Sequence, residues 1–209
     1  MSTLLIDLPS SVYEYIVKLM NTQCLVAGKQ KYRIVECEAY YRADCHPDPY
    51  VHGSPEQKQY ETWYFNGYGL DITLGKEHED EDKCVYAGIL IRGVCTLEEI
   101  PRYVSGPANV LRELIKQFGS VTDSGSTFYL KDLPPELQIE RVIYRSTRIG
   151  LFQKKGDTDF HIRPYRFLTD LVVEHKFKSK EKALRQWVLD RRLDADAAHK
   201  IMGYIISGL

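Results

Sequence analysis

Two glutamates, Glu36 and Glu38, and one tyrosine, Tyr40, stand at alternate positions of the run RIVECEAYY, residues 33–41. The run is typical of a β-strand, whose side chains alternate between two faces, so these three residues should share one face and the apolar residues between them the other. An acidic face beside an aromatic ring can form a site for general acid and base chemistry. The alternative is an edge strand with a solvated polar face.

The elements that would position this strand make a mixed α+β domain with a curved, mainly antiparallel sheet, flanking helices and a helical C-terminal tail. Helices are predicted after Pro9 with Ser10 or Ser11 as the cap, from 106–107 to 118, and at 179–190 and 195–206. Strands are predicted near 23–28, 31–40, 62–65, 68–72, 85–94, 139–150 and 160–173. Asn66-Gly67 favours a type I′ turn between two of them, and residues 119–137 are rich in turn formers.

Length and composition suit one domain over residues 1–175, with a helical appendage at 176–209 packed on it. The 209 residues carry five scattered cysteines, no apolar run of membrane length and no basic region near the start. These features indicate a soluble protein of a reducing compartment, in the cytoplasm, nucleoid or nucleus, that is not secreted.

Charge is unevenly distributed along the chain. The net charge of -1 does not suit a protein that binds DNA, but residues 141–187 hold 12 Lys or Arg against 5 Asp or Glu. Residues 77–82 are almost wholly acidic. One face is therefore expected to be basic.

Several segments resemble the alkyladenine (3-methyladenine) DNA glycosylase family in collinear order over residues 10–168. RIVECEAY is similar to the family's R-I-V-E-T-E-A-Y, and residues 87–92, AGILIR, are similar to its V-L-L-R strand. Residues 105–111, SGPANVL, resemble its S-G-P-x-x-L helix start. Residues 146–150, STRIG, and 163–167, RPYRF, resemble its A-x-R-V/I-G and K/R-P-x-R-F/Y motifs.

The resemblance implies an enzyme that flips a damaged purine nucleotide out of the duplex and hydrolyses its N-glycosidic bond. By that resemblance Glu38 is the general base that activates water, Glu36 is structural, and Tyr40 stacks on the flipped base. Arg92 matches an arginine expected near the active-site water, with a buried structural ion pair as the alternative. Arg148 and Arg166 match positions expected to be structural.

The second stacking position is a histidine in the family, and both His46 and His52 are candidates, each with an exposed loop histidine as the alternative. The family also inserts a tyrosine from a β-hairpin into the minor groove. Here Tyr64, Phe65 and Tyr68 are candidate wedges on the hairpin 62–72, although each could instead pack in the core.

Asp71 is a departure, because the family's asparagine at this base-binding position donates a hydrogen bond and an ionised aspartate cannot. The family's T-P-R-N tract is also missing. The spacing of Cys37, Cys45, His46 and His52 fits no usual zinc pattern, so no metal or other cofactor is expected. A lysine-rich segment could touch DNA or be a solvated surface: Lys176, Lys178, Lys180, Lys182 and Arg185.

The sequence therefore predicts a monomeric, monofunctional glycosylase for alkylated or deaminated purines, of the 3-methyladenine and hypoxanthine type, in double-stranded DNA. It is not expected to engage a membrane. The alternative is a nucleic-acid- or nucleotide-binding protein that keeps the fold without repair activity.

Overall fold

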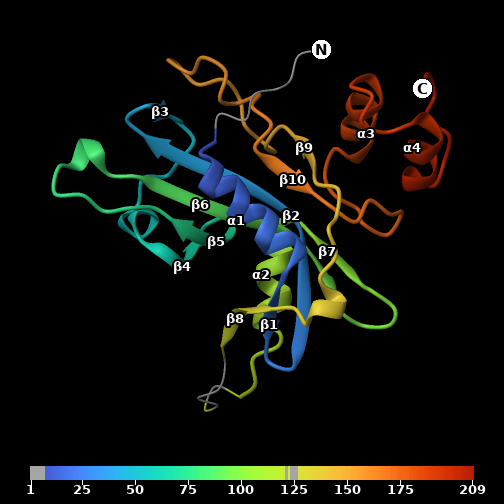
Figure 1. The fold of residues 1–209 in the computed structure, drawn as a ribbon, viewed down its shortest axis with the longest axis horizontal. Helices are drawn as coiled ribbons and strands as arrows, with labels where there is room; N and C mark the ends of the chain where they lie inside the picture. Colours follow the sequence, from blue (N-terminus) through green and yellow to red (C-terminus); the bar gives the residue numbers. More distant parts are fainter. Residues whose placement is uncertain (1–7, 121, 123–126) are drawn as a thin grey trace.

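Ten strands form one curved antiparallel sheet in the computed structural model, which describes residues 8–120, 122 and 127–209 (Figure 1). The strands are β1 Gln23–Ala27, β2 Gln30–Ala43, β3 His46–Pro47, β4 Tyr60–Asn66, β5 Gly69–Leu74, β6 Tyr86–Thr96, β7 Tyr103–Ser105, β8 Phe128–Asp132, β9 Tyr144–Ser146 and β10 Arg166–Leu168. The helices are α1 Ser10–Asn21, α2 Pro107–Ile115, α3 Lys180–Leu189 and α4 Ala195–Met202.

Strand β2 is the centre of the sheet. The main path of neighbouring strands is β4-β5-β6-β2-β1-β8, and β3 and β10 also pair with β2. Strand β6 is buried along its whole length, and β2 is buried from Tyr32 to Ala39. The strand with the two glutamates is therefore interior, and the solvated edge-strand alternative is wrong.

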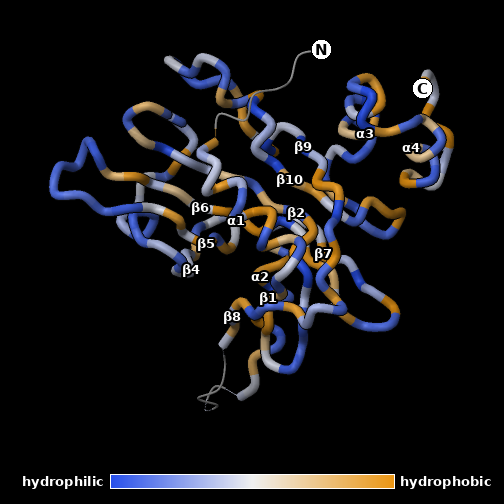
Figure 2. The backbone as a smooth tube through the Cα atoms, viewed as in Figure 1, coloured by the Kyte–Doolittle hydropathy of each residue, from blue (hydrophilic) through white to orange (hydrophobic). Residues whose placement is uncertain are grey.

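The two faces of the central strands differ sharply in character. Leu70 and Ile72 of β5, and Ile89 and Ile91 of β6, join the apolar core to which α1 and α2 contribute. Figure 2 shows this hydrophobic material running through the central strands and both helices, with hydrophilic loops around it. The residues that alternate with these apolar positions, such as Asp71, face the other side.

The C-terminal helices form a separate apolar cluster at one end of the molecule (Figure 1). Trp187 and Leu184 of α3, with Ala198 of α4, pack with Leu168 of β10. The Trp187 indole donates a hydrogen bond to the Arg145 carbonyl at 2.7 Å. The tail is thereby attached to the sheet edge formed by β9 and β10.

The predicted α+β class with a curved antiparallel sheet and a helical tail is confirmed, and the differences are local. Strands β9 and β10 are short where longer strands were predicted, and β8 lies in a segment predicted to be only turns. Residues 1–7, on which the absence of a basic leader rests, and 121 and 123–126 of the turn-rich segment lie outside the described residues.

The hairpin turn is displaced by one residue from its prediction. Asn66 pairs with Gly69, so the turn residues are Gly67 and Tyr68, and neither has a positive φ. The Asn66 side chain accepts hydrogen bonds from the backbone N–H groups of Tyr68 and Gly69 at 2.7 and 2.9 Å. This side-chain bonding replaces the type I′ geometry and leaves Tyr68 exposed in the turn.

Within the part of the chain that the structure describes, no helix is long and apolar enough to cross a membrane.

Candidate active site

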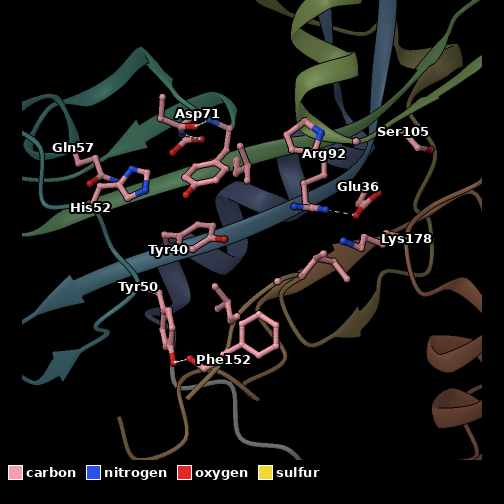
Figure 3. A pocket seen from close by; sticks show the side chains of 18 of the residues that line it. Glu36, Tyr40, Tyr50, His52, Gln57, Asp71, Arg92, Ser105, Phe152 and Lys178 are labelled. Carbon is pink, nitrogen blue, oxygen red and sulfur yellow. Dashed lines mark hydrogen bonds and ion pairs between the residues drawn. The ribbon is translucent and has the colours of Figure 1, made fainter. Parts of the chain in front are cut away.

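A cavity of about 840 Å³ opens on the face of the central strands that carries their polar residues. In Figure 3, Tyr40 and Arg92 lie in the middle of this cavity, with Asp71 and His52 on one side and Tyr50 and Phe152 on the other. The lining comes from the strands β2, β5 and β6, the segment 50–57 and the loop 149–154, with further residues from the hairpin turn and from 105–107, and with Lys176 and Lys178.

An irregularity in β2 decides which residues reach this cavity. Tyr32 and Ile34, at even-numbered positions of the strand, belong to the apolar core. Cys37, at an odd-numbered position, belongs to the same core. The pairing register between β2 and β6 shifts on both sides of Glu36. From this point on, the odd-numbered side chains of β2 point to the core and the even-numbered ones to the other face of the sheet. The shift directs Glu36 and Tyr40 to the cavity, and the predicted shared face of Glu36, Glu38 and Tyr40 is confirmed.

Glu36 joins two buried arginines. Its Oε1 accepts hydrogen bonds from Arg92 Nε at 3.0 Å and from Arg166 Nε at 2.8 Å. Burial lowers the pKa of Arg166, and the Glu36 and Glu38 carboxylates oppose that effect. A buried arginine needs such partners, so this arrangement holds Arg92 in place beneath the cavity.

Glu38 lies directly behind the cavity wall and is completely buried. Its Oε1 accepts from the Ile149 backbone N–H at 2.7 Å, and its Oε2 accepts from the Tyr40 hydroxyl at 2.9 Å and from Arg92 Nη1 at 3.3 Å. Burial raises the pKa of Glu38, although Arg92 and the Ile149 N–H act to lower it. A raised pKa makes this carboxylate a stronger base than an ordinary glutamate.

Asp71 is a second buried carboxyl group on the cavity wall. Burial raises its pKa to about 7, with the hydrogen bond from Asn66 acting against this and the Glu38 charge adding to it. Asn66 Nδ2 donates to Asp71 Oδ1 at 3.0 Å. Burial thus favours the protonated form of Asp71, and a protonated carboxyl can donate the hydrogen bond that an ionised aspartate cannot.

Tyr40 presents an aromatic surface to the cavity while its hydroxyl is held by Glu38. The Arg148 guanidinium lies 4.6 Å from the Tyr40 ring centroid and is itself fixed by Asp48 through bonds of 2.7 and 3.2 Å. Arg148 thus has the structural position expected of it. A ring supported in this way remains rigid when a ligand stacks on it.

The two candidate histidines occupy different environments. His52 is exposed and lines the cavity, with its ring 5.9 Å from that of Tyr68. His46 is buried between Tyr41 and Phe160 and stacks on Tyr165, outside the cavity lining. Only His52 is placed where it could contact a ligand in the cavity.

The hairpin aromatics also divide between the two faces. Tyr68 lines the cavity mouth, and Tyr64 lies behind it with its ring 6.5 Å from that of His52. Phe65 contacts Phe128 of β8 instead, at 5.8 Å between ring centroids. Tyr68 is therefore the hairpin aromatic nearest to a bound ligand.

The basic region 141–187 divides into internal and external charges. Five of its arginines form ion pairs within the molecule: Arg141, Arg148, Arg163, Arg166 and Arg185. Lys154, Lys176 and Lys178 are exposed and line the cavity mouth. The charge available to an anionic ligand is thus carried by lysines at the rim.

Sequence reasoning did not identify Tyr50, the Ile149 backbone N–H or Phe152 as part of the site. A backbone donor has no side-chain signature, and Tyr50 and Phe152 stand in loops without periodicity. Among the described residues no group of three or more His, Cys, Asp or Glu is arranged to hold a metal ion.

No known family model matches this sequence. One similar protein is an uncharacterized protein of Acanthamoeba polyphaga mimivirus, 29% identical over 212 residues. The match covers 86% of this chain and 94% of that protein, so the similarity extends over most of both.

Proposed function

We propose that this protein is a monofunctional DNA glycosylase that removes alkylated or deaminated purines by hydrolysis. One observation carries the proposal: a completely buried Glu38, with a raised pKa, is held directly behind the cavity wall by Tyr40, Arg92 and a backbone N–H. The same strand segment carries the resemblance to the alkyladenine glycosylases. No metal or other cofactor takes part.

The cavity has the dimensions and charge distribution that a flipped nucleotide requires. Its volume of about 840 Å³ lies within the range of small-molecule sites. Carboxyl groups lie deep and lysines lie at the mouth, so a base would enter while its phosphates remain beside the lysines.

Glu38 supplies the chemistry in this proposal. A carboxylate offers about four lone-pair positions, and the described donors occupy three of them, which leaves one for a water proton. As water attacks the sugar carbon, Glu38 accepts that proton while the bond from the carbon to the base nitrogen breaks. Its negative charge also stabilises the developing positive charge of the sugar, while Arg92 holds the carboxylate in position.

Tyr40 and Asp71 bind the base. The Tyr40 ring offers a stacking face to an alkylated purine, which carries positive charge. Protonated Asp71 donates a hydrogen bond to the base edge, which assists departure of a neutral purine such as hypoxanthine because that leaving group becomes negative.

The second candidate is a protein that binds nucleic acid or a nucleotide on this fold without catalysis. The observation that favours it is the position of Glu38, which has no exposed surface and lies behind Tyr40 and Arg92. A general base must come within hydrogen-bond reach of its water.

A glycosylase assay separates the two candidates. Oligonucleotides with a single hypoxanthine or 3-methyladenine are incubated with the wild-type protein and with Glu38→Gln, and base release is followed. The glycosylase proposal requires release by the wild-type protein and loss of release in the variant. Tight lesion binding with no release by either protein would establish the second candidate.

A further inference from the structure

Phe152 is one of the most exposed hydrophobic side chains of the described residues, at 83% exposure, yet it lines the mouth of the cavity. The chain that follows it is polar, with Gln153, Lys154 and Lys155 directly after it. An exposed aromatic ring beside lysines is typical of surfaces that bind single-stranded or distorted nucleic acid. The cores of protein interfaces are instead depleted in lysine.

The loop that carries Phe152 is firmly held, so this exposure is part of the fold. The Tyr50 hydroxyl lies 2.7 Å from the Phe152 carbonyl oxygen and 2.6 Å from the Asp157 carboxylate, and it accepts from the Lys154 backbone N–H at 3.2 Å. Gln153 Nε2 donates to the Asp157 carbonyl at 3.2 Å. These bonds fix the backbone that follows Phe152, and the bond from the Ile149 N–H to Glu38 fixes it three residues before, so the ring is presented outward at little entropic cost on binding.

The loop is also connected to the floor of the cavity. It begins at Ile149, whose N–H bonds to Glu38, so Phe152 lies only three residues from a direct contact with that carboxylate. Figure 3 places Phe152 on the opposite side of Tyr40 from His52, which contacts Tyr68 of the hairpin turn. The mouth therefore carries two exposed aromatic residues on different elements.

We propose that Phe152, with Lys154 and Lys155, forms a second nucleic-acid contact that acts from the lip opposite Tyr68. When a nucleotide leaves the stack, its neighbouring bases lose a stacking partner. The Phe152 ring covers one of these bases, and the adjacent lysines meet the phosphates beside it. This inference rests on the proposed function for the nature of the ligand.

The test uses the Glu38→Gln protein, so that binding is measured without base release. A duplex with hypoxanthine and 2-aminopurine beside it reports both affinity and loss of stacking. We expect Phe152→Ala to weaken binding about tenfold and to abolish most of the 2-aminopurine response, whereas Phe152→Tyr retains both. Ile100→Ala, an exposed apolar residue outside the cavity lining, is the matched control and should change neither.

Lysine substitutions supply an independent readout. Lys154→Gln and Lys155→Gln should each reduce the slope of log affinity against log salt by about 1, because each lysine neutralises one phosphate. Circular dichroism melting of every variant reports that the fold is retained.

The outcomes distinguish the two proposals. Unchanged affinity and fluorescence in Phe152→Ala, in a protein that binds the lesion duplex, would overturn the second contact alone. Failure of the parent protein to bind any DNA would overturn the proposed function itself, and the second contact with it.

Discussion

The floor and the rim of the cavity differ in solvent exposure: the residues of the floor are buried, and those of the rim are exposed. Glu36, Asp71 and Arg92 line the floor, and Glu38 and Arg166 lie directly behind it; all five are buried and joined by hydrogen bonds or charge. The rim consists of His52, Tyr68, Phe152, Lys154, Lys176 and Lys178, all exposed on loops, turns or segments outside the sheet.

The contrast separates groups whose acidity depends on being shielded from water from groups that must be exposed to contact a ligand. Removing water strengthens electrostatic interactions and shifts acidities, so the groups able to perform chemistry are confined to the sheet. Stacking surfaces and lysines meet a large ligand only where they protrude. Substitutions in the floor should therefore change chemistry and stability together, and substitutions in the rim should change binding alone.

The largest effect is expected at Glu38. Glu38→Gln keeps the shape of the side chain and loses the ability to accept a proton, so base release should fall at least about a thousandfold. Binding to a lesion duplex should stay within about tenfold of wild type. Single-turnover excision and fluorescence anisotropy measure the two quantities, and a fully active variant would remove Glu38 from the chemistry.

Asp71 should make stability depend on pH. Its pKa is raised from 3.8 to about 7 on folding, so it favours the folded state when protonated, and that contribution declines as pH rises from about 4 to about 7. The difference amounts to about 4 kcal/mol across this window. In urea titrations at pH 5 and pH 8, Asp71→Asn should lose less stability at pH 8 than the wild-type protein does. Equal losses would mean that Asp71 titrates normally.

Glu36→Gln should affect stability more than chemistry. The amide still accepts a hydrogen bond but removes the negative partner of buried Arg166 and one of the two negative partners of Arg92, which costs about 3 kcal/mol of unfolding free energy. Base release by the protein that remains folded should keep most of its rate. If Glu36→Gln were as inactive as Glu38→Gln while fully folded, the division of roles between the two glutamates would be wrong.

Substitution of His46 and His52 compares a buried histidine with an exposed one. His46→Ala removes a ring packed against Phe160 and Tyr165 and should cost about 2 kcal/mol of stability. His52→Ala should leave the melting temperature unchanged and weaken lesion binding. Thermal melting and anisotropy on both variants check the pair, and a stable His46→Ala protein with impaired binding would reverse the assignment.

Tyr68→Ala should give the smallest effect, about 1 kcal/mol in the excision of a lesion from duplex DNA. Excision from single strands should be unaffected, because no gap in a stack needs to be filled there. Phe65→Ala is the matched control on the other face of the hairpin. Equal losses on both substrates would show that Tyr68 supports the fold.

The sequence predicted the parts of this arrangement that depend on local pattern. Alternation in β2 identified Glu36, Glu38 and Tyr40 as one face, and the central strands and all four helices were placed within a few residues. Strand β8 was missed because, among the described residues, its partner is β1, about a hundred residues away, and nothing local requires an extended conformation there.

The unpredicted parts of the site depend on long-range or backbone contacts. The bond from Ile149 to Glu38 spans 111 residues and involves an N–H that every residue except proline possesses. Burial decides the acidity of Asp71, and a sequence gives residue types without their surroundings. Likewise, the count of basic residues in 141–187 gave no sign that five arginines are paired internally.

The Ile149 contact sets an order of events during synthesis. Glu38 leaves the ribosome early, but the loop that seals it and the β10 strand opposite it are made more than a hundred residues later. Without residues 149–168, Glu38 has neither the Ile149 N–H donor nor the β10 strand that pairs with its own strand. A chain that ends before residue 149 would therefore retain strands β1 to β8 in its sequence and still lack the backbone donor that contacts Glu38.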